Sequence, residues 1–156
     1  MKLKLAALGA ATVMLTGLGA AAPAAVAAPK AGPVAVQEAE FGALAAYCSS
    51  SKTISKSTTT YIHLPATSGG SITCEMSQGA NGIHVKKLQR ALVLCYGRSI
   101  AIDGAFGPAT YSALKYAQGK AGTAADGIYG PNTRDAIKWP RFYKSNNNFT
   151  GYCAKR

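Results

Sequence analysis

Residues 103–115 read DGAFGPATYSALK, and residues 126–138 read DGIYGPNTRDAIK. The two stretches are offset by 23 residues and are identical at seven of their 13 positions. Each begins with an Asp-Gly turn dipeptide, continues with an aromatic residue, and reaches Gly-Pro-x-Thr, where the proline suits the first position of a helix. A pattern of this length that recurs at a fixed spacing indicates an internal repeat. We therefore expect two similar loops, each of which starts a short helix.

A further helix is predicted directly before the first repeat. Apolar residues recur at helical spacing over residues 83–95. Asn81 can cap the start of this helix, and Gly97 suits the left-handed position at its end. Together with helices that begin at Pro108 and Pro131, this gives three short helices.

The flanking segments differ in composition from this helical part. Residues 52–64 are rich in Ser, Thr, Ile and Tyr, which favour a strand, and a Ser-Gly-Gly turn leads to a second expected strand over residues 71–76. Residues 48–76 are therefore expected to form a β-hairpin extension, and the polar residues 141–156 a C-terminal tail. The predicted fold class is mainly α, a compact three-helix domain over residues 79–140 with a disulfide-stapled N-terminal hairpin.

The N-terminus has the pattern of a secretory signal peptide. Lys2 and Lys4 precede an apolar run over residues 5–20, and small residues before Ala27 suit cleavage, so residues 1–27 are expected to be removed. The alternative is an uncleaved membrane anchor, but the run is short and is interrupted by Gly and Thr. Residues 28–47 are expected to be a linker.

The exported chain is strongly basic. Residues 28–156 contain 15 Lys and Arg against six Asp and Glu, a net charge of +9. A cation of this size attracts polyanions such as wall polymers, membrane surfaces and nucleic acid, but charge alone sets no specificity.

Four cysteines lie in the exported part, and an even number in an oxidising compartment indicates two disulfides. Three pairings are possible. We favour Cys48–Cys74, which would close the hairpin, and Cys95–Cys153, which would tie the tail to the helices. A zinc site of four cysteines is the alternative, but no Cys-x-x-Cys pair supports it.

Residues 79–139 resemble the bacterial peptidoglycan-binding domain of the three-helix type, which accompanies wall hydrolases or occurs as a free secreted module. The motifs that carry the resemblance lie at residues 79–89, 102–110, 113–118 and 126–133. The resemblance covers roughly half of the exported chain. It implies a three-helix fold and a ligand in the bacterial cell wall.

Peptidoglycan offers sugar faces that aromatic rings can cover and stem-peptide carboxylates that Arg or Lys can pair with. The candidate binding residues are the aromatic Phe106, Tyr111 and Tyr129, the cationic Lys87, Arg90 and Arg134, and the polar Asp103, Asp126 and Asn132. Structural roles compete with these assignments. The two aspartates can cap their turns, Phe106 and Tyr129 can fill the core, and the arginines can be solvated.

The sequence gives no support for catalysis. Its two histidines, His63 and His84, are 21 residues apart in different expected elements, and the six carboxylates form no evident acid/base pair. We expect no enzyme activity, no cofactor and no metal.

Three hypotheses about function follow. The first is a secreted or wall-associated, monomeric, non-catalytic module that binds peptidoglycan through its glycan or its stem peptide. The second is a secreted protein-interaction factor that inhibits or recruits a wall enzyme or protease through the hairpin and tail. The third is binding of a polyanion, such as wall teichoic acid or nucleic acid, driven by charge. We expect no specific nucleic-acid partner and no membrane association after signal cleavage.

Overall fold

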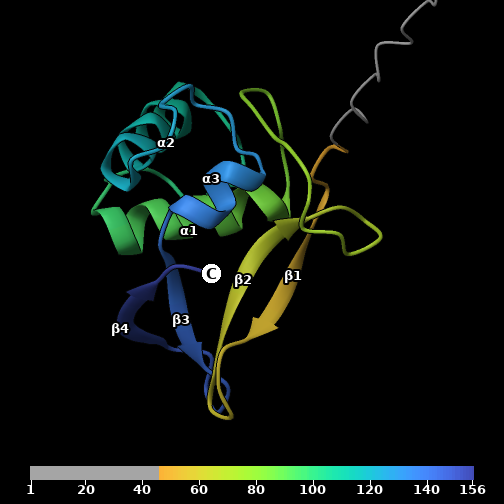
Figure 1. Cartoon of the computed structure of the whole chain (residues 1–156), viewed down its shortest axis with the longest axis vertical. Helices are drawn as coiled ribbons and strands as arrows, with labels where there is room; N and C mark the ends of the chain where they lie inside the picture. Colours follow the sequence, from red (N-terminus) through yellow and green to blue (C-terminus); the bar gives the residue numbers. More distant parts are fainter. Residues whose placement is uncertain (1–45) are drawn as a thin grey trace, which may run out of the picture. The chain divides into compact units, whose positions relative to one another are not determined.

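The computed structural model describes residues 46–156 (Figure 1). The predicted signal peptide and nearly all of the predicted linker lie outside these residues. The elements in chain order are β1 (Ser50–Ser55), β2 (Thr60–Ala66), α1 (Ile83–Tyr96), α2 (Pro108–Ala121), α3 (Pro131–Ala136), β3 (Trp139–Tyr143) and β4 (Phe149–Ala154). Figure 1 shows the helices gathered at one end and the two β-hairpins at the other.

The prediction of a mainly α fold is wrong, because the chain also forms a four-stranded antiparallel sheet of order β1-β2-β3-β4. β1 and β2 make one hairpin, and β3 and β4 make the other. The hairpins are joined at only two paired positions, Thr60 with Tyr143 and Tyr61 with Phe142. The backbone N–H of Lys144 also donates to the carbonyl of Thr59 at 2.8 Å, so the two hairpin ends are fastened together.

The first hairpin forms within a segment that was predicted to be one strand. Its turn lies between Ser55 and Thr60, where the Ser57 hydroxyl accepts the backbone N–H groups of Thr59 at 3.2 Å and Thr60 at 3.0 Å. Short hydroxyl side chains stabilise turns in this way. The turn was not predicted because the segment as a whole has a high strand propensity. Residues 71–76, expected to be the second strand, instead contact the helical part: Met76 pairs with Tyr129.

Residues 141–156 are not an irregular tail. They complete β3 and supply β4, and Trp139 and Phe142 of β3 are both buried. Burial of these two aromatic rings supplies the hydrophobic free energy that a polar tail would lack.

The helix boundaries agree closely with the sequence patterns. Pro108 and Pro131 are the first residues of α2 and α3. Gly97 ends α1 in the left-handed conformation, with φ of 62°. The cap of α1 differs, because its N-cap is Gly82, and Asn81 donates to the carbonyl of Gly79 instead. Within residues 46–156, no helix is long and apolar enough to cross a membrane.

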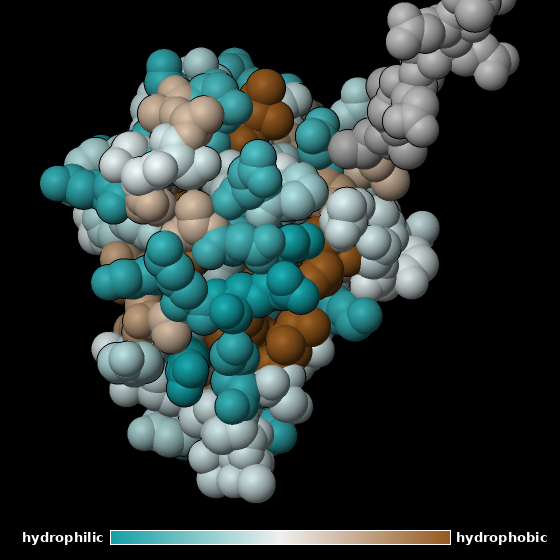
Figure 2. Space-filling model, in the orientation of Figure 1, coloured by the Kyte–Doolittle hydropathy of each residue, from teal (hydrophilic) through white to brown (hydrophobic). Residues whose placement is uncertain are grey.

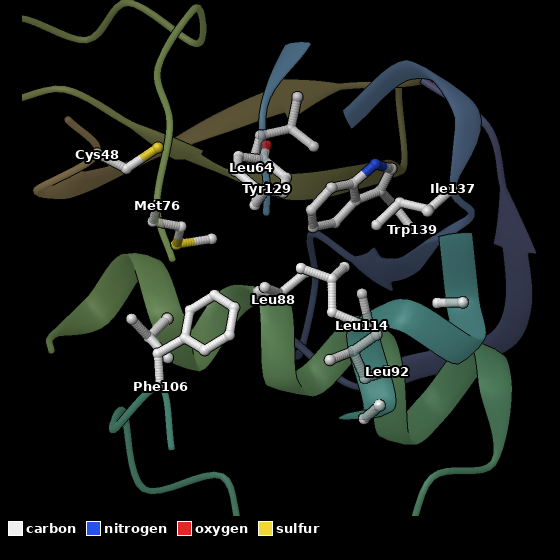
Figure 3. Close-up of a cluster of buried hydrophobic side chains, with 14 of the residues drawn as sticks. Cys48, Leu64, Met76, Leu88, Leu92, Phe106, Leu114, Tyr129, Ile137 and Trp139 are labelled. Carbon is white, nitrogen blue, oxygen red and sulfur yellow. The ribbon is translucent and has the colours of Figure 1, made fainter. Parts of the chain in front are cut away.

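One hydrophobic core joins the helices to the sheet (Figure 3). Leu88 and Leu92 of α1 and Leu114 of α2 are fully buried in the same cluster as Leu64 of β2 and Trp139 of β3. The sheet residues therefore stabilise the helices directly, and the extension and the helical part form a single core.

Both disulfides have the pairings favoured from the sequence, Cys48–Cys74 and Cys95–Cys153. The first ties the start of β1 to the segment that leads into α1. The second ties the end of α1 to β4, whose cysteine is the penultimate residue of that strand.

Candidate functional site

Each Asp-Gly loop closes around a buried glutamine side chain. In the first loop the Gln89 amide nitrogen donates to the Asp103 carboxylate at 2.9 Å and lies 3.0 Å from the Thr110 hydroxyl, and its carbonyl accepts the Gly104 N–H at 2.9 Å. The Asp103 carboxylate also accepts the Ala105 N–H at 2.8 Å. These hydrogen bonds, the Ala105 bond first, lower the pKa of Asp103.

The second loop repeats this network. The Gln118 amide nitrogen donates to the Asp126 carboxylate at 2.8 Å and to the Thr133 hydroxyl at 2.9 Å, and its carbonyl accepts the Gly127 N–H at 2.9 Å. The Asp126 carboxylate accepts the Ile128 N–H at 2.8 Å. In both predicted binding aspartates, one carboxylate oxygen therefore accepts hydrogen bonds from within the protein that close the loop.

The three predicted binding aromatics mostly face protein. Phe106 and Tyr129 are 2 % and 0 % exposed, so neither ring offers a face to a ligand. Tyr129 meets Trp139 edge-on, with ring centroids 6.1 Å apart, and burial raises the pKa of its phenol. Tyr111 is half-buried, and its ring packs directly on the backbone of Gly127.

Arg134 is buried and is fully engaged within the protein. It pairs with both carboxylate oxygens of Asp135, at 2.8 and 2.6 Å, and donates to the carbonyl of Ile72 at 2.9 Å. The bond to Ile72 joins α3 to the segment after the first hairpin. Arg134 therefore fixes structure, and a ligand carboxylate would have to compete with Asp135.

Lys87 and Arg90 lie on α1 beside the sheet. The Arg90 guanidinium sits 4.6 Å from the ring centroid of Phe142, a cation–π contact. Burial, followed by the charges of Lys87 and Arg90, lowers the pKa of His63 on β2 to about 4. Arg90 therefore contacts the sheet, and the charge of Lys87 acts on His63 of the sheet.

The structure does not bring the nine predicted binding residues to one surface. The Asp103 loop, the Asp126 loop and the Lys87–Arg90 face of α1 are separate places in the fold. Asn132, at the start of α3, is exposed.

A different surface has the chemistry of a binding site. We call it the basic cleft: a hollow of about 460 Å³ between the ends of α1 and α2, α3 and the C-terminal residues, lined by Tyr96, Tyr116, Lys120, Lys138 and Lys155 with parts of three neighbouring residues. None of its lining residues is acidic. On the face drawn in Figure 2, hydrophilic side chains gather where Figure 1 places α3 and the C-terminus.

The two tyrosines shape the cleft. The Tyr96 hydroxyl accepts the backbone N–H of Lys138 at 2.7 Å, which leaves its own hydrogen available to donate. Burial raises the pKa of Tyr96, so the phenol keeps this hydrogen at neutral pH. Tyr116 is 41 % exposed, and Arg98 lies 4.5 Å from its ring centroid. The cleft therefore presents hydrogen-bond donors, positive charge and one open aromatic ring.

None of the five residues that define the basic cleft was predicted to bind ligand. Tyr116 and Lys120 are one helical turn apart on α2, and this spacing alone could have marked them as neighbours. Lys138 and Lys155 come from either end of the second hairpin, which the sequence did not reveal.

Three solved structures are similar to part of the chain. An endolysin of Burkholderia phage AP3 is 39% identical over 38% of this chain, with a TM-score of 0.36, and the chain spans only 22% of that endolysin. The N-terminal domain of SleB is 35% identical over 40% of this chain and 85% of its own length, with a TM-score of 0.38. A peptidoglycan-binding protein from Clostridioides difficile, solved with glutamine hydroxamate, is 35% identical over 55% of this chain and 48% of its own, with a TM-score of 0.42. No curated protein matches the chain.

A family model provides the assignment. Residues 81–137 match the family described as "Putative peptidoglycan binding domain". The matched segment contains all three helices and both Asp-Gly loops, whereas the whole sheet lies outside it. Through residues 81–137, the chain belongs to the peptidoglycan-binding domain family.

Proposed function

We propose that this protein is a secreted, non-catalytic module that binds bacterial peptidoglycan, with stem-peptide carboxylates bound in the basic cleft. The observation that carries the proposal is the lining of that cleft: three lysines, a donating tyrosine and no acidic residue, built largely on the helices of the matched segment.

The chemistry of the cleft suits a carboxylate. Ammonium groups of Lys120, Lys138 and Lys155 form charge-assisted hydrogen bonds with carboxylate oxygens, which are about twice as strong as neutral ones. The Tyr96 hydroxyl adds a neutral donor with a fixed position, because its oxygen is held by the Lys138 amide. The exposed part of the Tyr116 ring, which is 41 % exposed and contacted by Arg98 and Lys120, offers an apolar surface to the aliphatic part of a peptide.

The absence of catalysis is part of the proposal and is supported by how the three aspartates and His63 are used. Asp103 and Asp126 close their loops, and Asp135 pairs with Arg134 and with Arg156. His63 has a pKa of about 4 and lies 3.1 Å from the Thr53 hydroxyl, so it is a weak base at neutral pH. Groups engaged in this way are poorly placed to transfer protons to a substrate.

Secretion is proposed from two features that agree. The N-terminal sequence has the basic, apolar and small-residue regions of a signal peptide. All four cysteines are paired in disulfides, which persist in oxidising compartments.

The test is retention on purified sacculi. The double variant Lys120→Gln, Lys138→Gln is compared with Lys52→Gln, Lys56→Gln, which removes the same charge from the first hairpin. We expect the cleft variant to bind about tenfold more weakly at moderate salt, since each lost charge-assisted bond contributes on the order of 1.5–3 kcal/mol before screening by solvent. The control variant should lose much less.

Two results would count against the proposal. A wild-type protein that stays wholly in the supernatant at moderate salt excludes peptidoglycan binding. Equal losses in both variants, with steep salt dependence and no retention on sacculi stripped of teichoic acid, would show that net charge and an anionic polymer account for retention.

A further inference from the structure

A second cleft lies where the N-terminal extension meets the start of α1. We call it the histidine cleft: a hollow of about 430 Å³ whose polar and aromatic lining includes Tyr47, Ser49, Glu75, Gln78, Asn81 and His84. Most of this lining precedes residue 81 and so lies outside the matched family segment. The Cys48–Cys74 disulfide and the backbone hydrogen bonds of Glu75 with Ala46 and Cys48, each 2.9 Å, hold its walls together.

His84 is the unusual residue of this cleft. It is only 4 % exposed, yet its Nδ1 atom has no hydrogen-bond partner. A hydrogen bond with the backbone of Ser49 acts to raise the pKa of His84. Because Nδ1 has no partner, we assign this bond and the ring proton to Nε2. Burial outweighs this bond and lowers the pKa of His84 overall. At neutral pH the ring is therefore uncharged, and Nδ1 is a hydrogen-bond acceptor that has no donor within the protein.

Gly82 lies directly against this side of the His84 ring. A Cβ atom at that position would lie 3.1 Å from Cε1 and 3.2 Å from Nδ1 of His84. Gly82 also has φ of 136°, a backbone conformation that other residues rarely adopt. No side chain caps the first turn of α1, which begins at the same place.

The remaining lining groups suit a neutral ligand that is rich in hydroxyl groups. Glu75 adds a half-buried carboxylate acceptor, and Gln78 and Asn81 add amides, each of which can both donate and accept. Tyr47 is 80 % exposed and supplies a flat apolar ring at the edge. No Lys or Arg lines this cleft, so it lacks the attraction for anions that marks the basic cleft.

We infer that the histidine cleft binds a sugar unit of the glycan strand, with a hydroxyl or acetamido N–H group of the sugar donating to Nδ1 of His84 and the sugar ring lying against Tyr47. The inference rests on the proposed function and deepens it: the basic cleft takes the stem peptide, and the histidine cleft takes the glycan. A buried acceptor without a partner is costly, and a ligand donor would remove that cost on binding.

The test uses the whole protein and glycan strands from which an amidase has removed the stem peptides. Tyr47→Ala is compared with Tyr152→Ala, which removes an exposed tyrosine from β4. We expect Tyr47→Ala to weaken strand binding about tenfold, because a lost aromatic face costs on the order of 1 kcal/mol or more. Tyr152→Ala should bind as the wild type does.

A spectroscopic measurement follows the acceptor itself. In the ¹⁵N spectrum of the imidazole side chains, the Nδ1 resonance of His84 should move as glycan strands are added, whereas the resonances of His63 should not. Glu75→Gln, which keeps the size of the side chain, should also weaken binding without changing the melting temperature.

The outcomes separate the two claims. Retention on sacculi without any binding to peptide-free strands overturns this inference and leaves the proposed function standing. Strand binding that is unchanged in Tyr47→Ala, with an unmoved Nδ1 resonance, also overturns it. Loss of sacculus retention in the basic-cleft variant, with strand binding intact, supports separate peptide and glycan sites.

Discussion

The two Asp-Gly loops are closed by the same hydrogen-bond network but pack against different neighbours. Each closes on a buried glutamine, Gln89 or Gln118, whose amide bonds an aspartate carboxylate, a loop amide and a threonine hydroxyl. The polar atoms that made these loops candidates for ligand binding are largely used within the loops. The repeat therefore specifies a frame, and the surfaces left for ligands are the clefts around it.

The loops differ in what packs on them from outside. The first loop pairs with the residues just before α1, since Phe106 donates to the Ala80 carbonyl at 2.9 Å and Gly82 donates to the Gly104 carbonyl at 2.9 Å. The second loop pairs with Met76 and is covered at Gly127 by the ring of Tyr111. A rigid ring packs on the second loop, whereas a flexible side chain lies near the first. Substitution by alanine should therefore be more destabilising at Gly127 than at Gly104.

The largest effect is expected for Gly127→Ala. Gly127 has φ of 76°, and a Cβ atom would lie 2.2 Å from Cε2 of Tyr111. Left-handed strain and displacement of the ring should together lower the free energy of unfolding by about 4 kcal/mol. Urea denaturation measures this, and the double variant Tyr111→Ala, Gly127→Ala should recover the part that is due to the ring.

Gly104→Ala is the matched control. Its φ of 87° is similar, but a Cβ atom would meet mainly the flexible Lys86 side chain, at 2.9 Å, and the Gly82 carbonyl, at 3.1 Å. The expected loss is about 2 kcal/mol, chiefly backbone strain. Equal losses at the two glycines would show that the ring of Tyr111 moves aside without cost, and the contrast between the loops would fail.

Gln118→Ala should have an effect between those of the two glycine variants. It leaves the Gly127 N–H and the Thr133 hydroxyl without their buried partner and opens a cavity, so the free energy of unfolding should fall by about 3 kcal/mol. Gln89→Ala should cost a similar amount, because its network is the same. Gln78→Ala, at an exposed residue, is the control for stability. A loss below about 1 kcal/mol at either buried glutamine would mean that water replaces the amide readily.

The local parts of this fold could be predicted from the sequence, and the distant pairings could not. Helix starts at proline and the end of α1 at Gly97 follow from residue types and spacing. The cysteine count predicted two disulfides, and the pairing favoured among three is confirmed. The sheet does not, because β2 and β3 are separated by the entire helical part and meet at only two positions. The polar composition of residues 141–156 gives no sign of β3 and β4, because Trp139 and Phe142 are buried against helical residues that are distant in the sequence.

The same limit applies to the sites. Asp103 and Phe106 were candidates because they stand out locally, yet one closes a turn and the other is in the core. The basic cleft needs both Lys155 and Tyr96 in its lining, and this placement depends on the sheet that the sequence did not reveal. A binding site assembled from distant segments cannot be found before the topology that assembles it.

The smallest predicted effect concerns the Asp103 carboxylate and pH. The pKa of Asp103 is lowered, first by the N–H of Ala105 and then by Gln89, with a minor contribution from the charge of Lys86. A lowered pKa stabilises the fold above the ordinary value of 3.8, and this stabilisation is lost as the pH falls through the lower value of the folded state. A carboxyl ¹³C titration should give a midpoint below 3.8 in the wild type, and Gln89→Ala should move it upward. An unmoved midpoint would mean that the backbone of the loop alone holds the carboxylate, so that the glutamine serves the amide of Gly104 and not the charge of Asp103.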